Sequence, residues 1–513
     1  MKRLALLLLT SLPFAGCFTD VPNLCDNGNC SPGDGGTSSG DAKADAPPAG
    51  CASGKDPKDD ALCVTNDTGL FVDAAAAEGG DGTKERPLKT LGKAVEKAQA
   101  GKGVVFVCGA GPYVEGVNVT GRVSLFGGFT CGTWAHAGGK TEAAPAVGPA
   151  LVAGKGATFL AQDFKWTAES AQGDGASSIA VFAKQAALLE LVRNDVVAGT
   201  GSTGKEGDGG TAGNGGTMGG IPSGLTRGTG GVTDCGAGVT STGGNGGDGN
   251  MTMGQAGVIG VSNPALYDEL DASNTGAGGG GYKNPTAGDI ALPGRNGKNG
   301  AASTAVGAAA ATYGTLTETG FVSTTGTAGA GGNVGQGGGG GGGNAAIGGG
   351  GGGGGGCGGT GGKGGSGGGS SIAIASVAST VRLKATKLTT AAPGKGGIGG
   401  AGGGGGGGGG VGATTGLPGG DGGNGAGGNG GGGGTGGLSV GVLYMGAAPS
   451  VDGASVSNAP TGEYHVAPTV ADNGGEGGGP GAKSTVRAGH DGNPGKAGDK
   501  GKSGVRAAVL KAD

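Results

Sequence analysis

The sequence predicts an all-β protein, built as a stack of repeated strand units that is interrupted by long glycine-rich insertions. Three observations predict this architecture. A unit of strand, turn and strand recurs three times, glycine contributes 142 of the 513 residues, and aromatic residues make up 4%. A chain with so few large side chains cannot fill one large core. Its apolar residues must therefore be used locally, as in a solenoid whose rungs stack on one another.

The first 17 residues have the features of an export signal. Two basic residues precede an apolar stretch at 4–12, which is too short to span a bilayer but fits the apolar part of a signal peptide. The sequence Phe14-Ala15-Gly16-Cys17 then resembles the bacterial lipobox, although that motif prefers Leu where Phe14 stands. This resemblance implies that Cys17 is lipidated and that the protein is anchored to a membrane. Because Phe18 and not Asp follows the cysteine, the resemblance implies the outer membrane, with the protein exposed at the cell surface.

Eight cysteines remain if Cys17 is lipidated, and an even number in an exported chain predicts disulfides. Sequential pairing is the simplest hypothesis. It joins Cys25 to Cys30, Cys51 to Cys63, Cys108 to Cys131, and Cys235 to Cys357. No Cys-x-x-Cys motif is present, and the three histidines, His136, His465 and His490, are scattered and expected at the surface. Zinc sites usually show closely spaced ligands, so we predict no metal site and no cofactor.

Order is expected to begin after a flexible tether at 18–66, which is rich in Asp, Gly, Ser, Ala and Pro. A first block of rungs is predicted at 67–200. Within it, a helix is expected over 88–100, because Leu88, Leu91, Val95 and Ala98 recur at helical spacing. Pro87 suits the first turn of this helix, and the apolar and alternating runs at 104–108, 117–119 and 123–129 predict strands.

The run from Gly82 to Phe129 resembles the opening of pectin-lyase-like proteins. The matching residues are Gly82-Thr83, Pro87, Thr90, Tyr113, Glu115 and the run 126–129. This resemblance covers about a tenth of the chain. It implies a right-handed parallel β-helix whose first rung is covered by the helix at 88–100. It also places Cys108 and Cys131 on neighbouring rungs.

Further rungs are predicted where the repeated strand unit returns. The units begin near Ser177, Ser370 and Leu438, and each leads into glycine-rich sequence. We therefore expect rungs at 370–393 and 437–470, with glycine-rich insertions at 201–369 and 394–436 and a glycine-rich segment at 471–513. In this hypothesis Ile179, Ile372 and Val440 share one core.

The glycine-rich insertions have a period of three. Glycine stands at every third position from Gly201 to Gly219, from Gly416 to Gly437, and from Gly489 to Gly504. Three residues per turn is the repeat of a polyproline-II-type helix, so a bundle of polyglycine-II helices is one interpretation. Disorder is the other, because each ordered glycine costs about 0.5–1 kcal/mol relative to alanine. Overall, the composition of these segments resembles that of PGRS-type bacterial surface proteins.

Two classes of function fit the sequence. The first is a structural or adhesive surface lipoprotein, not an enzyme, with polysaccharides or other surface proteins as partners in addition to the membrane. The second is a carbohydrate-active β-helix enzyme, a polysaccharide lyase or hydrolase, which requires clustered carboxylates on one face. The formal net charge of −4 lacks the excess of basic residues that is typical of nucleic-acid-binding proteins, so we predict no nucleic-acid partner. Charged residues in the strands, such as Glu190, Arg193 and Asp195, are isolated in the sequence and expected to be solvated, so we predict no catalytic residues.

Overall fold

The structure is a computed structural model that describes residues 51, 55–250, 255, 257–263, 291–412, 417–457, 459, 465–469, 472–485 and 491–512. The chain divides into two compact units, residues 1–44 and 45–513, and all described residues belong to the second unit. Among them, one α-helix and many strands make the fold nearly all-β, as predicted. Cys17, Cys25, Cys30 and His490 lie outside the described residues.

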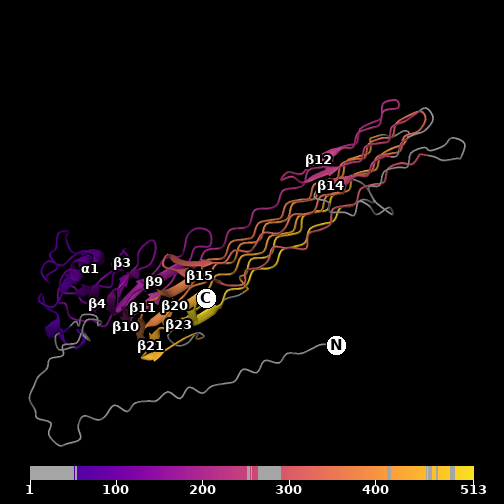
Figure 1. The fold of residues 1–513 in the computed structure, drawn as a ribbon. Helices are drawn as coiled ribbons and strands as arrows, with labels where there is room; N and C mark the ends of the chain where they lie inside the picture. Colours follow the sequence, from indigo (N-terminus) through magenta and orange to yellow (C-terminus); the bar gives the residue numbers. More distant parts are fainter. Residues whose placement is uncertain are drawn as a thin grey trace, which may run out of the picture. The chain divides into compact units, whose positions relative to one another are not determined.

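Three sheets with parallel strands make up most of the strand structure (Figure 1). The first sheet has the order β1 (Leu70–Val72), β2 (Val104–Cys108), β4 (Arg122–Phe129), β7 (Thr158–Gln162), β10 (Leu188–Val192), β18 (Val381–Lys384), β21 (Ser450–Val451) and the antiparallel β22 (Ala454–Ser455). The second sheet contains β5 (Thr141–Ala143), β8 (Phe164–Thr167), β11 (Asp195–Val197), β19 (Lys387–Thr389) and β23 (His465–Val466). The third contains β3 (Val117–Val119), β6 (Leu151–Ala153), β9 (Ser178–Lys184), β17 (Ser371–Val377), β20 (Ser439–Met445) and β24 (Arg506–Lys511).

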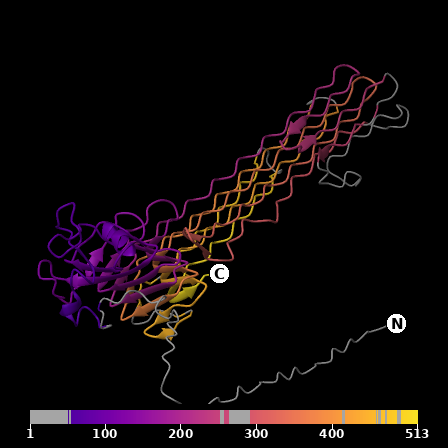
Figure 2. The same cartoon turned by 60° about the vertical axis from the view of Figure 1, so that its left-hand side comes forward.

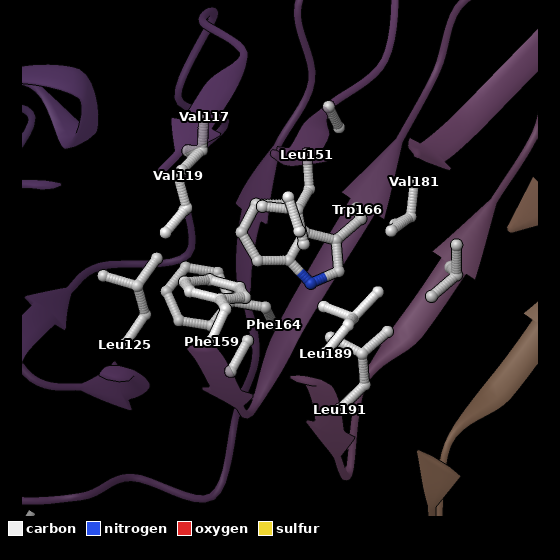
Figure 3. Close-up of a cluster of buried hydrophobic side chains, with 14 of the residues drawn as sticks. Val117, Val119, Leu125, Leu151, Phe159, Phe164, Trp166, Val181, Leu189 and Leu191 are labelled. Carbon is white, nitrogen blue, oxygen red and sulfur yellow. The ribbon is translucent and has the colours of Figure 1, made fainter. Parts of the chain in front are cut away.

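Successive turns of the chain visit these sheets in the same order, third, first and second. The sets β6–β7–β8, β9–β10–β11 and β17–β18–β19 each supply one strand to each sheet. Strands of neighbouring turns pair in register, so that Phe159 lies beside Leu189 and Leu189 beside Val381. Like side chains therefore stack along the core. Figure 3 shows this core, where Trp166 and Phe164 from the second sheet stack 4.9 Å apart among leucines and valines of the other two.

The corner between the first and second sheets is repeated from turn to turn. Asp163, Arg193 and Ala385 each occupy this corner, and each has a left-handed backbone with φ of 60°, 55° and 46°. Beside it, the buried side chain of Asn194 accepts hydrogen bonds from the Phe164 amide and the Trp166 ring nitrogen, and donates one to the Ala161 carbonyl. The corner thus satisfies backbone groups that the change of sheet would leave unpaired.

The helix α1 (Leu91–Gln99) packs against β1 to β4. It begins three residues later than the predicted start at 88, because Thr90 is the N-cap and Leu88 pairs with Val72 in an isolated bridge. The carboxylate of Glu115 accepts hydrogen bonds from the free amides of Leu91 and Gly92, which favours a helix start there. The four apolar residues that predicted the helix are all buried. A short 3-10 turn, η1 (Ala61–Cys63), precedes β1.

The predicted repeat of Ile179, Ile372 and Val440 is confirmed. These residues pair side by side on β9, β17 and β20 and belong to one hydrophobic cluster. The cluster is separate from the central core, and Leu316 and Phe321 also belong to it. Those two residues come from the hairpin of β15 (Gly314–Thr317) and β16 (Gly320–Ser323), which lies inside the predicted insertion 201–369. The same insertion holds the antiparallel strands β12 (Val232–Asp234), β13 (Thr240–Thr242) and β14 (Val261–Asn263).

The glycine-rich segments run side by side in both views (Figure 1, Figure 2). They carry no regular strand assignment, yet their amides are hydrogen-bonded at every third residue. For example, the amides of Gly204, Gly207 and Gly210 donate to the carbonyls of Lys395, Ile398 and Ala401. The described parts of these segments are therefore ordered in the structure, which favours the first of the two interpretations.

Candidate functional surface

Three disulfides join the described cysteines, and they are the pairs that sequential pairing predicts. Cys51 bonds to Cys63, Cys108 to Cys131 and Cys235 to Cys357, with Cα atoms 5.1, 5.0 and 5.4 Å apart. Two groups of potential metal ligands occur among the described residues, and each contains both sulfurs of one of these disulfides. Oxidised sulfurs are not thiolates, so neither group offers the ligands that a zinc ion needs.

Charged residues expected to be isolated are in fact paired. The guanidinium of Arg193 lies 2.7 Å from Asp163 and 2.9 Å from Asp56, and Lys384 lies 2.6 Å from Glu190, which is 9% exposed. Lys140 also lies 2.5 Å from Asp195. The sequence could not reveal these pairs because their members come from different turns. Each carboxylate is bound to a cation, an arrangement typical of structural ion pairs and not of an acid–base pair that exchanges protons with a substrate.

Of the two described histidines, His465 is buried and His136 is half-buried, which corrects the expectation that they lie at the surface. His136 lies 3.3 Å from Asp163 beside the Arg193 pair. His465 is 3% exposed, and its Nε2 lies 3.0 Å from the Thr390 hydroxyl, which in turn lies 2.8 Å from that of Ser439. Burial, together with the positive charge of Arg506, lowers the pKa of His465 to about 4. This row of polar side chains is enclosed between sheets, where a substrate has no access.

The aromatic residues with the best chance of stacking on sugars are also buried. Trp134 is 3% exposed and packs edge-on against Phe71. The Tyr113 hydroxyl donates to the Cys108 carbonyl and accepts from the Ala74 amide, and burial raises its pKa. Both side chains therefore support the end of the stack near α1.

One groove lies beside the third sheet, with a volume of about 410 Å³. Loop residues 146–149 and 168–172, the start of β9 and the tip of the β15–β16 hairpin line it. Its lining is mostly apolar, with Ile179, Phe182 and Phe321, and Glu169 is its one carboxylate. A lone carboxylate does not supply the pair that glycoside hydrolysis uses.

Serine side chains connect the rungs to the glycine-rich segments. Ser177 accepts a hydrogen bond from the Ser370 amide, and Ser370 accepts one from the Leu438 amide, so three successive turns are linked at one corner. Ser371 similarly accepts from the Ala391 amide. The serines at 177 and 370 thus link the starts of β9, β17 and β20.

The segment 417–437 lies at the centre of the glycine-rich bundle. Its amides donate in three directions, to 394–409, 324–339 and 493–502, and its carbonyls accept from 350–368, 475–481 and 294–307. Six neighbours therefore surround it, and its residues 423–437 are buried. An added Cβ at Gly428 would lie 2.0 Å from the Thr360 carbonyl oxygen, so only glycine allows this approach.

The segment 394–412 lies in the outer layer of the bundle. We define the outer layer as segments 201–220, 394–412 and 473–482. The middle one pairs with the first through the Gly204 amide and with the third through the Gly399 amide, which donates to the Glu476 carbonyl. On its inner side it pairs with 351–369 and 417–437. Segment 394–412 thus has four neighbouring segments, whereas segment 417–437 has six.

The open side of the outer layer is flat and carries few long side chains. Along 394–412 every third residue faces outward, and the exposed Lys395, Ile398 and Ala401 lead into glycines. Ile398 is 47% exposed. A Cβ at Gly404 would meet Ala482 at 3.6 Å, in ordinary contact, and one at Gly479 would meet nothing within 4 Å. The period of three in the sequence reveals that such a face exists, but not which segments form it.

Comparison with known proteins finds no protein-family model, curated protein or solved structure that matches this chain. Within the described residues, no helix has both the length and the apolar character needed to cross a membrane.

Proposed function

We propose that the chain is an exported lipoprotein, held at the bacterial outer membrane through Cys17, that acts at the cell surface by binding and not by catalysis. In this proposal the three-sheet part is a right-handed parallel β-helix of the pectin-lyase-like kind, with α1 as its cap. The glycine-rich segments are polyglycine-II helices packed into a bundle. The partners are glycans, matrix or other cells.

The repeated path through three sheets supports the β-helix. Each turn supplies one strand per sheet, and the left-handed corner recurs at Asp163, Arg193 and Ala385. Parallel strands joined by a crossover connection are right-handed in about 98% of cases, which supports that handedness here.

The hydrogen-bond pattern supports polyglycine-II helices. A helix with three residues per turn directs its amides in three directions, each used by every third residue. The segment 417–437 has this pattern, with Gly428 donating to 403, Asn429 to 330 and Gly430 to 496.

The outer layer is the observation that carries the proposed binding role. It is a flat surface on a framework in which backbone hydrogen bonds tie each segment to several others. A surface fixed in this way loses little conformational entropy when it binds a partner. By contrast, the carboxylates of Asp56, Asp163 and Glu190 are bound to cations, and the groove holds a single carboxylate, Glu169.

Binding and cleavage assays test this proposal together. Purified protein is mixed with insoluble polysaccharides and with intact cells, and both the bound fraction and the release of reducing or unsaturated sugar ends are measured. We expect binding without product. The alternative, a carbohydrate-active enzyme, predicts cleavage that is abolished by Glu169→Gln, with Glu190→Gln as a control outside the groove. Such cleavage would overturn the proposal.

A further inference from the structure

On the open side of the outer layer, two rows of backbone groups have no hydrogen-bond partner within the described part of the chain. In segment 394–412 the amides of Gly397 and Gly400 donate inward, and those of Gly399 and Gly402 donate to 473–482. The amides between them, at 398, 401, 404 and 407, have no partner among the described residues. The carbonyls at 399, 402, 405 and 408 are likewise unpaired within the described part of the chain. The two rows correspond to the two neighbours that this segment lacks.

These rows restrict the kind of partner. Successive groups in a row are three residues apart, which is about 9 Å in a helix that rises about 3.1 Å per residue. A partner must therefore present acceptors and donors at the same repeat, on a surface flat enough to approach along its length. Inside the bundle that requirement is met by other glycine-rich segments of this chain. The carbonyls at 395, 398 and 401, for instance, accept from amides at the same three-residue spacing.

We infer that the outer layer binds the outer layer of a second copy of this chain, and that this contact continues the packing of the bundle across a two-fold interface. The inference rests on the proposed binding role and names its partner. A face that carries both a donor row and an acceptor row is complementary to itself, as a two-fold interface requires. Each layer supplies the missing neighbours of the other.

The side chains on the face are compatible with this pairing. The described segments of the outer layer carry five charged residues, Lys205, Glu206, Asp208, Lys395 and Glu476, of which Asp208 pairs with Lys363 and Glu476 with Lys500. The middle of the face, from Ala401 to Gly410, is neutral. Segment 394–412 itself carries no side chain larger than a methyl group between Ala401 and Gly410, and the exposed Met218 of segment 201–220 lies at the end of this stretch. Ile398 gains burial in the interface, which adds apolar contact to the backbone pairing.

Charge introduced on the face tests the inference. The double variant Ala401→Glu/Gly404→Glu places like charges opposite each other in a two-fold interface, without entering the bundle, since both positions face outward. Ala328→Glu/Ala497→Glu adds the same charge at two exposed alanines outside the outer layer and serves as the control. The mature chain is studied with its disulfides intact by sedimentation velocity over a range of concentrations.

We expect the unmodified chain and the control to form dimers. The face variant should dimerise about 100-fold more weakly, the scale of like charges opposed in an interface. Ala401→Lys/Gly404→Lys should also be monomeric alone, but mixing it with the Glu variant should restore a mixed dimer. That rescue cannot arise from misfolding.

Two outcomes would overturn the inference. One is an unmodified chain that remains monomeric at every concentration. The other is a dimer that the face variant leaves intact. If the chain is monomeric but the face variant loses binding to a polysaccharide, the outer layer binds a glycan instead, and the proposed binding function stands without self-association. If dimers form but neither glycan nor cell binding is detected, self-association is supported. The proposal that the chain binds glycans, matrix or other cells is then contradicted.

Discussion

Replacement of one buried glycine should open the bundle, and the structure indicates by how much. At Gly428 an added methyl group would lie 2.0 Å from the Thr360 carbonyl oxygen, and ordinary contact begins near 3.4 Å. The oxygen must therefore move by about 1.4 Å, the difference between these distances. The same oxygen accepts from the Gly403 amide at 2.8 Å, and Gly428 itself donates to Gly403 and accepts from Gly481. A displacement of this size breaks or weakens all three hydrogen bonds.

The expected loss of stability for Gly428→Ala is about 2–3 kcal/mol. Each of the three bonds contributes about 1 kcal/mol. Alanine also lowers the conformational entropy of the unfolded chain, and this offsets the loss of stability by about 0.4–1 kcal/mol. Gly479→Ala is the matched control, because its methyl group would meet nothing within 4 Å. It should be neutral or slightly stabilising.

Calorimetry and amide hydrogen exchange distinguish the two variants. Gly428→Ala should lower the temperature of the bundle transition and speed exchange in peptides from 351–369, 394–412 and 417–437. The strands of the three sheets should keep their protection. Equal exchange in Gly428→Ala, Gly479→Ala and the unmodified protein would refute the reasoning, since the close backbone approach would then not stabilise the bundle.

Three further predictions concern the anchor, a disulfide and a buried histidine. Cys17→Ser should release the protein from membranes, and an unchanged detergent partition with no acyl mass on the mature N-terminal peptide would contradict lipidation. Replacing Cys108 and Cys131 together with alanine should lower the free energy of unfolding by about 2–4 kcal/mol in denaturant titrations, and an unchanged midpoint would show that the bond contributes nothing. His465 has a folded pKa of about 4 against an ordinary value of 6.5, so its contribution to stability is present above pH 6.5 and is lost as the pH falls toward 4. His465→Gln should flatten this dependence between pH 6.5 and 5, and an identical pH profile would argue against a neutral buried histidine.

The pairing of the strands in the parallel sheets could be predicted in part from the sequence, because their side chains encode the register. Ile179, Ile372 and Val440 stand at the same place in three similar units, and alternation of apolar residues fixes which side of a strand is buried. The strand at 104–108 and the helix face at Leu91, Val95 and Ala98 were recognisable for the same reason.

The pairing of the glycine-rich segments could not be predicted. Segment 201–220 pairs with 351–369 in antiparallel order and with 394–412 in parallel order, yet glycine has no side chain that favours one neighbour over another. Polar side chains at the edges give some direction, such as the ion pair of Lys363 and Asp208 at 2.9 Å, but these residues are 155 positions apart. The contact of His465 with Thr390 was hidden in the same way, since 75 residues separate them.

Segment 201–220 pairs with segments that come much later in the sequence, and this separation has a consequence for how the protein folds during synthesis. Its neighbours at 351–369 and 394–412 are synthesised after it, so its hydrogen bonds can form only later. Contacts this distant in sequence are slow to close. A waiting strand rich in valine and isoleucine would be prone to aggregate, whereas a segment rich in glycine has low β-propensity and exposes little apolar surface. The composition that permits close packing in the finished bundle also keeps the unpaired segment soluble until its neighbours arrive.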